Sequence, residues 1–196
     1  MKKIMLLCAI LMVSVMTSAC INNLAVQELN NKAEAYLNKG DTETAICRLK
    51  SSLDLDDEIY QTHYNLAAAY IQIGNYEDAR LEADKVLKLK PDLYDAYYLI
   101  ASAEEASAYK TIAGGLNETD AASVSEFIIK AQNAVDYFNK YLSNVPNAPE
   151  TRKINEKITE LNNKIKEYTQ NSAIDENRQN TETQEHTEVK EQEMQQ

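Results

Sequence analysis

The chain has 196 residues, 44% of them hydrophobic, and a formal net charge of −11 at pH 7. This length suits one modest domain with tails, and the apolar fraction is enough for a packed core, which disfavours a collagen or a wholly disordered chain. The acidic balance disfavours nucleic acid and anionic lipid headgroups as partners, because phosphate contacts need a basic patch that the sequence lacks.

The first nineteen residues differ from the rest of the chain. Lys2 and Lys3 precede an uncharged apolar run over residues 4–15, and small or hydroxyl-bearing residues follow up to Ala19. The pattern is typical of a secretion signal, and the run is shorter than the roughly twenty apolar residues that span a bilayer. We therefore expect residues 1–19 to be a signal peptide that is removed.

Residues 16–20, with the sequence MTSAC, resemble the bacterial lipobox. The resemblance implies that Cys20 receives a diacylglycerol and becomes the first residue of a lipid-anchored protein. Ile21 in place of Asp implies sorting to the outer membrane, facing the periplasm, if the host is Gram-negative. Residues 20–25 then form the lipidated N-terminus and a short linker. The alternative is an ordinary signal cleaved near Ala19, which leaves a soluble periplasmic protein.

Two stretches of the chain repeat each other at an offset of 34 residues. The clearer copy contains Tyr64, Leu66, Ala67, Tyr70, Gly74, Tyr76, Ala79, Leu87 and Pro91, and the earlier copy contains Ala33, Tyr36, Gly40, Ala45 and Leu53. Small residues and tyrosines recurring in fixed phase are typical of helical hairpins that each bury one face against the next. The chain resembles the tetratricopeptide repeat family.

This resemblance implies an all-α fold, a short α-solenoid of antiparallel helical hairpins over residues 26–170. The repeats are expected at about 26–59, 60–93 and 94–147, with a C-terminal capping helix at 150–170. Gly40 and Gly74 are expected to end the leading helices, with Asp41 and Asn75 as N-caps of the helices that follow. Residues 171–196 are rich in acidic and polar residues and predict a disordered acidic tail.

The third hairpin is expected to be longer than the other two. Ala101 and Ala134 match the repeat pattern, but the stretch between them exceeds the family spacing by about six helical turns. The simplest interpretation lengthens both helices by about three turns and places Gly114, Gly115 and Asn117 in the turn that joins them.

The reactive residue types do not form a catalytic set. His63 is expected to be a buried, hydrogen-bonded core residue, Cys47 a half-buried apolar filler, and His186 an isolated residue in the tail. Phosphate-binding loops, metal-ligand clusters and nucleophile motifs are missing from the sequence. We therefore expect no catalytic residue, no metal, no cofactor and no small-molecule substrate, which means that the protein is not an enzyme.

In tetratricopeptide repeats the leading helices line a concave groove that grips peptides or helices. The matching positions here are Asn30, Glu34, Asn38, Tyr64, Asn65, Ala68, Gln72, Tyr98, Ser102 and Glu105. Relatives that clamp acidic chaperone tails carry lysines at some of these positions, and none stands here, so an adaptor of that kind is disfavoured. A plain solvated helix face is the second interpretation, although tyrosines favour contact with a partner.

Together these patterns predict an envelope-anchored scaffold that binds a partner protein or peptide through this groove, with the assembly of an envelope machine as its role. The alternatives are an accessory subunit of an envelope enzyme, such as a wall-remodelling hydrolase, and a soluble periplasmic scaffold. A shared fold does not choose among these roles.

Overall fold

The computed structural model describes residues 23–113 and 121–171. The predicted signal peptide, Cys20, the turn at Gly114 and Gly115, His186 and the acidic tail lie outside these ranges. In the described ranges every regular element is a helix, which confirms the all-α prediction. Among these helices, none combines the length and apolar character needed to cross a membrane.

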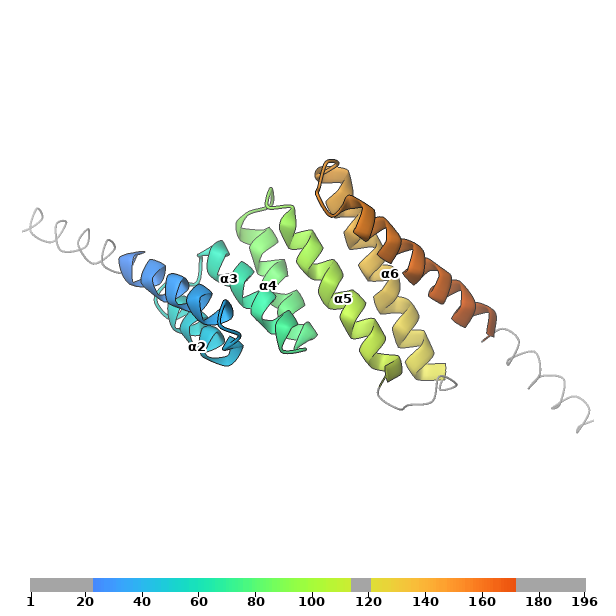
Figure 1. Cartoon of the computed structure of the whole chain (residues 1–196), viewed down its shortest axis with the longest axis horizontal. Coiled ribbons are helices and arrows are strands. Elements are labelled where there is room, and N and C mark those ends of the chain that lie inside the picture. The colour runs from blue at the N-terminus through green and yellow to red at the C-terminus, as the bar shows by residue number, and fades with distance from the viewer. Residues whose placement is uncertain (1–22, 114–120, 172–196) are drawn as a thin grey trace, which may run out of the picture. The chain divides into compact units, whose positions relative to one another are not determined.

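The helices follow one another as antiparallel pairs (Figure 1). They are a helix over residues 23–37, α2 (Thr42–Leu53), α3 (Tyr60–Gln72), α4 (Tyr76–Leu89), α5 (Asp95–Ala113), α6 (Ala121–Asn144) and a helix over residues 151–171. The chain divides into two compact units between Ala103 and Glu104, within α5. Each unit is described by itself below.

In the first unit, two glycines end the leading helices as predicted. Gly40 and Gly74 have φ angles of +78° and +75°, which L-residues with a Cβ rarely adopt. Asp41 caps α2, since its Oδ1 accepts a hydrogen bond from the backbone N–H of Thr44 at 3.2 Å. Asn75 occupies the N-cap position of α4, but its side chain donates to Asp78 Oδ2 at 2.7 Å instead of bonding to the backbone.

The core of the first unit is built largely from small residues. Its buried members are Ala33, Ala45, Ile46, Leu49, Leu66, Ala69, Tyr70, Ala79 and Ala103. Alanines at facing positions let helix axes approach to the short end of the usual range of about 8–10 Å. The recurrence of Ala45 and Ala79 at the 34-residue offset therefore reflects close packing inside each hairpin.

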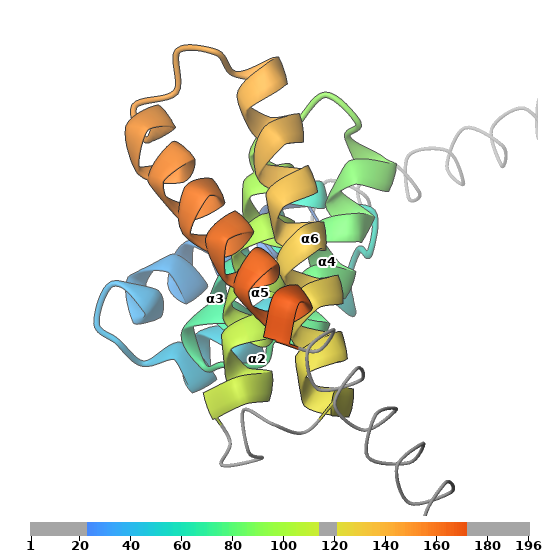
Figure 2. The same cartoon turned by 90° about the vertical axis from the view of Figure 1, so that its right-hand side faces the viewer.

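In the second unit, α6 and the helix over residues 151–171 lie side by side in both views (Figures 1 and 2). Phe127 and Phe138 of α6 and Leu161 of the last helix are fully buried. The ring of Phe127 meets those of Tyr109 and Tyr168 edge to face, at centroid distances of 5.9 and 5.2 Å. The last helix therefore covers an aromatic core.

Both described helices of the third hairpin are longer than their counterparts in the second hairpin. The helix α6 has 24 residues against 14 in α4, an extension of nearly three turns as predicted. The helix α5 has 19 residues against 13 in α3, an extension of less than two turns. The rest of the predicted extension of α5 falls on residues 114–120, which lie outside the described ranges.

Candidate functional site

The predicted groove residues fall in both units. Nine of them, from Asn30 to Ser102, belong to the first unit, and Glu105 belongs to the second. In the first unit Glu34, Asn38 and Gln72 are exposed, while Asn30, Tyr64, Asn65, Ala68, Tyr98 and Ser102 are half-buried. The leading helices of this unit therefore present a stripe of partly accessible side chains.

Three pairs of carboxamide side chains repeat at the 34-residue offset, one member on the helix over residues 23–37 or in the turn that follows it and the other on α3. The pairs are Gln27 with Gln61, Asn31 with Asn65, and Asn38 with Gln72. Asn65 is half-buried and the other five are exposed. A carboxamide offers both a donor and an acceptor, which are the groups that a peptide backbone presents. We call these six residues the amide stripe.

The sequence analysis identified only half of the amide stripe. Gln27, Asn31 and Gln61 were missed, although the same 34-residue offset connects them to their partners. Two members already bond to polar neighbours at the surface. Gln27 Nε2 donates to Asn23 Oδ1 at 2.8 Å, and Gln72 Oε1 accepts from Thr42 Oγ1 at 3.0 Å. Exposed bonds of this kind exchange readily with water or with a ligand.

Asn30 is a predicted groove residue but does not belong to the amide stripe, because its side chain forms hydrogen bonds inside the fold. Its Nδ2 lies 3.0 Å from the Val26 carbonyl, 3.0 Å from Ser52 Oγ and 2.9 Å from Thr62 Oγ1. Its Oδ1 is buried and has no hydrogen-bond partner. The amide of Asn30 therefore connects the helix over residues 23–37 to α2 and α3.

Tyr64 occupies on α3 the place that Tyr98 occupies on α5, 34 residues later. Burial raises the pKa of the Tyr64 hydroxyl, and the nearby Asp95 carboxylate and Tyr98 raise it further. The hydroxyl therefore stays protonated and able to donate a hydrogen bond. Asp95, in the first turn of α5, was missed by the sequence analysis.

In the second unit Glu105 is tied to the last helix. Its Oε2 lies 2.5 Å from Lys157 Nζ, and only 14% of the Glu105 side chain is exposed. Lys157 Nζ also lies 5.9 Å from the ring centroid of Phe138. The carboxylate of Glu105 thus helps to hold the helix over residues 151–171 in place.

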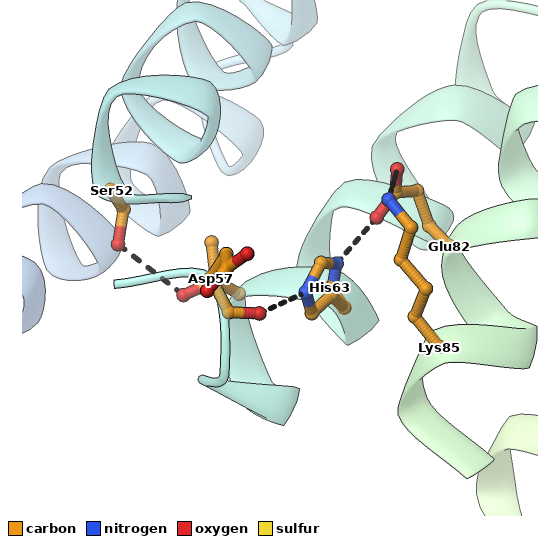
Figure 3. A network of polar contacts seen from close by, with 6 residues as sticks. Ser52, Asp57, His63, Glu82 and Lys85 are labelled. Carbon is orange, nitrogen blue, oxygen red and sulfur yellow. Dashed lines mark hydrogen bonds and ion pairs between the residues drawn. The ribbon is translucent and has the colours of Figure 1, made fainter. Parts of the chain in front are cut away.

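His63 is buried and hydrogen-bonded, as predicted (Figure 3). Its Nδ1 lies 2.5 Å from Glu82 Oε2 and its Nε2 lies 2.8 Å from the Asp57 carbonyl oxygen. Glu82 also accepts a hydrogen bond from Lys85 Nζ at 3.0 Å. A histidine whose two nitrogens both face oxygen acceptors is engaged in holding the fold, which leaves no free nitrogen for catalysis.

The pKa values of this pair shift in opposite directions. Burial by itself lowers the pKa of His63, but the hydrogen bonds to Glu82 and to the Asp57 carbonyl outweigh burial and raise it. For Glu82, burial raises the pKa, but the hydrogen bonds from His63 and Lys85 outweigh burial and lower it. Both shifts favour the charged forms of the two side chains.

Cys47 is exposed, so the prediction of a half-buried filler is wrong. The buried face of α2 consists of Ala45, Ile46, Leu49 and Ser52, and position 47 falls outside that phase. Within the described ranges, no three His, Cys, Asp or Glu side chains are grouped closely enough to hold a metal ion.

Comparison with known proteins agrees with the geometry of the first unit. Residues 36–105 match the model of the tetratricopeptide repeat. No curated protein matches the sequence. The fold is an all-α helical repeat of the tetratricopeptide type, as the following solved structures show.

The second tetratricopeptide domain of human RPAP3, in complex with the HSP70 peptide SGPTIEEVD, has 16% identity and a TM-score of 0.55, covering 72% of this chain and 98% of that one. The first such domain of human RPAP3 has 20% identity and a TM-score of 0.53, covering 70% and 95%. The TPR2B domain of yeast Sti1, in a complex with pHsp70, has 16% identity and a TM-score of 0.52, covering 71% and 98%. Identities this low show a shared fold alone.

Proposed function

We propose that the protein is an envelope-anchored tetratricopeptide-type scaffold that binds an extended segment of a partner protein along the amide stripe. The observation that carries the proposal is the repetition of carboxamides at the 34-residue offset on two neighbouring helices. A series of groups that both donate and accept suits a peptide backbone, whose N–H and C=O groups alternate along its length. Tyr64 and Tyr98 add aromatic area beside the stripe.

The partner segment is neutral or basic. The second tetratricopeptide domain of human RPAP3 is bound to a peptide with two glutamates and an aspartate. The predicted groove positions of the first unit include Glu34 but no lysine or arginine. Bringing such an acidic peptide to this face would place like charges together, which disfavours binding.

The scaffold is proposed to be attached to the bacterial envelope through a lipid on Cys20, after removal of residues 1–19. In a Gram-negative host the lipid would lie in the outer membrane, with the helical units in the periplasm. The support is the lipobox-like sequence MTSAC at residues 16–20. In this location the protein would bring a partner to an envelope assembly and would act by binding, without turnover.

Site-specific photocrosslinking in the native host tests the partner surface. A photoreactive amino acid is placed at Gln61 of the amide stripe or, as the matched control, at Lys88 on α4, since both side chains are exposed. We expect a protein adduct from position 61 that is absent from position 88 and weakened by Asn31→Ala with Asn65→Ala. The same adducts from both positions, or none from position 61, would contradict the proposed surface.

Mass spectrometry of the mature protein tests the anchor independently. We expect an N-terminal peptide that begins at Cys20 and carries a diacylglycerol, and loss of membrane association after Cys20→Ser. An unmodified N-terminus would refute the anchor but would leave the partner surface standing.

A further inference from the structure

The first helical hairpin, formed by the helix over residues 23–37 and α2, shares an apolar core with the second, formed by α3 and α4, and a group of buried polar side chains also joins the two. Ser52 and Thr62 are both 0% exposed, and their hydroxyl oxygens lie 3.3 Å apart. Asn30 Nδ2 is within hydrogen-bonding distance of both. His63 follows Thr62 and reaches the loop between the hairpins (Figure 3). We call these four residues, together with Glu82 and the Asp57 carbonyl, the polar seam.

The next copy of the repeat shows that this fold does not need polar groups there. Moving on by 34 residues replaces Ser52 with Val86 and Thr62 with Ala96, and both replacements are 0% exposed. The residue equivalent to His63 is Tyr97. The junction between the second hairpin and α5 is therefore packed with apolar side chains at the places where the first junction is polar.

A polar junction is held together differently from an apolar one. Buried hydrogen bonds add little net stability when they are made, because the unfolded chain bonds to water, but each costs heavily when one partner is lost. The seam already contains one buried acceptor without a partner, Asn30 Oδ1. The stability of the polar seam therefore depends on all of its remaining hydrogen bonds being formed.

Whether all the hydrogen bonds of the seam can form depends on the protonation of His63. Both ring nitrogens face oxygen acceptors, so only the doubly protonated imidazolium donates to Glu82 and to the Asp57 carbonyl together. When either ring nitrogen of His63 loses its proton, the lone pair of that nitrogen faces the oxygen of Glu82 or of the Asp57 carbonyl, and the hydrogen bond is lost. The charged groups that face the ring are Glu82 and Lys85 from α4, and the loop contributes the carbonyl of Asp57. Ser52 on α2 and Thr62 on α3 are uncharged.

We propose that the polar seam is a pH-controlled hinge, in which the protonated His63 holds the first hairpin closed against the second and its deprotonation lets the first hairpin open. The geometry sets the direction of the change. The pKa of His63 is raised in the folded chain, so its stabilisation is complete below the ordinary value and is lost as the pH rises through the folded value. Because the pKa of Glu82 is lowered, the closed state persists into mild acid.

Hydrogen exchange of the full chain, measured by mass spectrometry at pH 6 and pH 9 and corrected for intrinsic exchange rates, tests the hinge. We expect the opening equilibrium of residues 23–53 to be larger at pH 9 than at pH 6, by at most about tenfold for each unit by which the folded pKa of His63 exceeds its ordinary value, because Glu82 stays in the second hairpin when the first one opens. The helix α6, in the second unit, should change by less than about twofold over the same range. Equal opening of residues 23–53 at both pH values, or an equal change in α6, would overturn the proposal.

Variants taken from the chain itself sharpen the test. His63→Tyr introduces the residue that the next repeat carries and should abolish the pH step, whereas His186→Gln is the matched histidine control and should leave it unchanged. Ser52→Val with Thr62→Ala leaves only the Val26 carbonyl as an acceptor for Asn30 Nδ2, so it should increase opening at both pH values while the step remains. A step that survives His63→Tyr would refute the role of His63.

A second measurement does not depend on any variant folding. Nitrogen-15 spectra of the His63 ring in the wild-type chain should show both nitrogens protonated at pH 6. A neutral ring with one protonated nitrogen at pH 6 would overturn the proposal by itself.

Discussion

Replacing the glycine of a hairpin turn by alanine isolates the cost of one backbone conformation. Gly40 and Gly74 have φ angles of +78° and +75°. A Cβ added at Gly40 would meet nothing within 4 Å, and one added at Gly74 would lie 3.8 Å from the Tyr76 hydroxyl oxygen, an ordinary contact. Steric overlap therefore contributes nothing at either position, and only the left-handed backbone opposes alanine.

The expected loss follows from two opposing terms. The left-handed conformation costs an L-residue about 1–2 kcal/mol. Alanine also restricts the unfolded chain, which returns about 0.4–1 kcal/mol. Each of Gly40→Ala and Gly74→Ala should therefore destabilise the first unit by about 1 kcal/mol. The double variant should lose about twice as much, since each cost belongs to the backbone conformation of its own glycine.

Urea denaturation followed by circular dichroism measures this loss. With a slope of about 1–3 kcal/mol per molar urea, each substitution should lower the midpoint by about 0.3–1 M without changing the slope. Gly74→Asn is the matched control and should cost less than Gly74→Ala, because asparagine tolerates the left-handed region better. An unchanged midpoint in both alanine variants, or asparagine costing more than alanine, would refute the reasoning.

Three further predictions concern the two cores. Ala79→Leu should destabilise the first unit by about 1–3 kcal/mol in urea denaturation, because Ala79 is 1% exposed between packed helices; a neutral effect would contradict the close packing. Phe138→Ala should cost the second unit about 3–5 kcal/mol by the same assay, because the ring is fully buried, and a loss below about 1 kcal/mol would contradict that core. The Tyr109 hydroxyl should ionise at a higher pH than an ordinary tyrosine, because burial and its hydrogen bond to Glu160 raise its pKa. The difference between the ultraviolet titration curves of the wild type and Tyr109→Phe should show this ionisation above the ordinary range. Ionisation in the ordinary range would contradict the prediction.

The predictions from sequence that succeeded depend on local chemistry. A glycine that ends a helix, such as Gly74, is set by the backbone conformation of its own turn, and the recurrence of Ala45 and Ala79 is set by the distance between two paired helices. Both leave a signal within a few residues. The all-α fold class could be predicted because the helix-ending glycine and the closely packed alanine recur from one repeat to the next.

The features that sequence reasoning missed depend on contacts between distant residues or on phase within a helix. His63 pairs with Glu82, 19 residues away, and no spacing rule for a single helix connects them. The inward turn of Asn30 depends on the hydroxyls of Ser52 and Thr62. Cys47 was misplaced because its burial was assigned by residue type, although the phase of α2 put it outside the buried face.

The amide stripe and the polar seam share the first hairpin, and this links binding to pH. Asn31 lies on the helix over residues 23–37 and Asn65 on α3, and these are the two helices that the hydrogen bond from Asn30 to Thr62 connects. A segment that bonds to both helices stabilises the closed seam, because a ligand shifts an equilibrium by its differential affinity for the two states. A segment that touches α3 alone has no such preference.

The crosslinked partner segment therefore provides a test of the link. Its affinity, measured by calorimetry, should fall between pH 6 and pH 9 by the factor by which the population of the closed state falls. A truncated segment that contacts α3 alone should bind equally at both pH values, and His63→Tyr should remove the pH dependence of the full segment. If the full segment bound equally at both pH values while hydrogen exchange showed the first hairpin opening, the stripe and the seam would act independently.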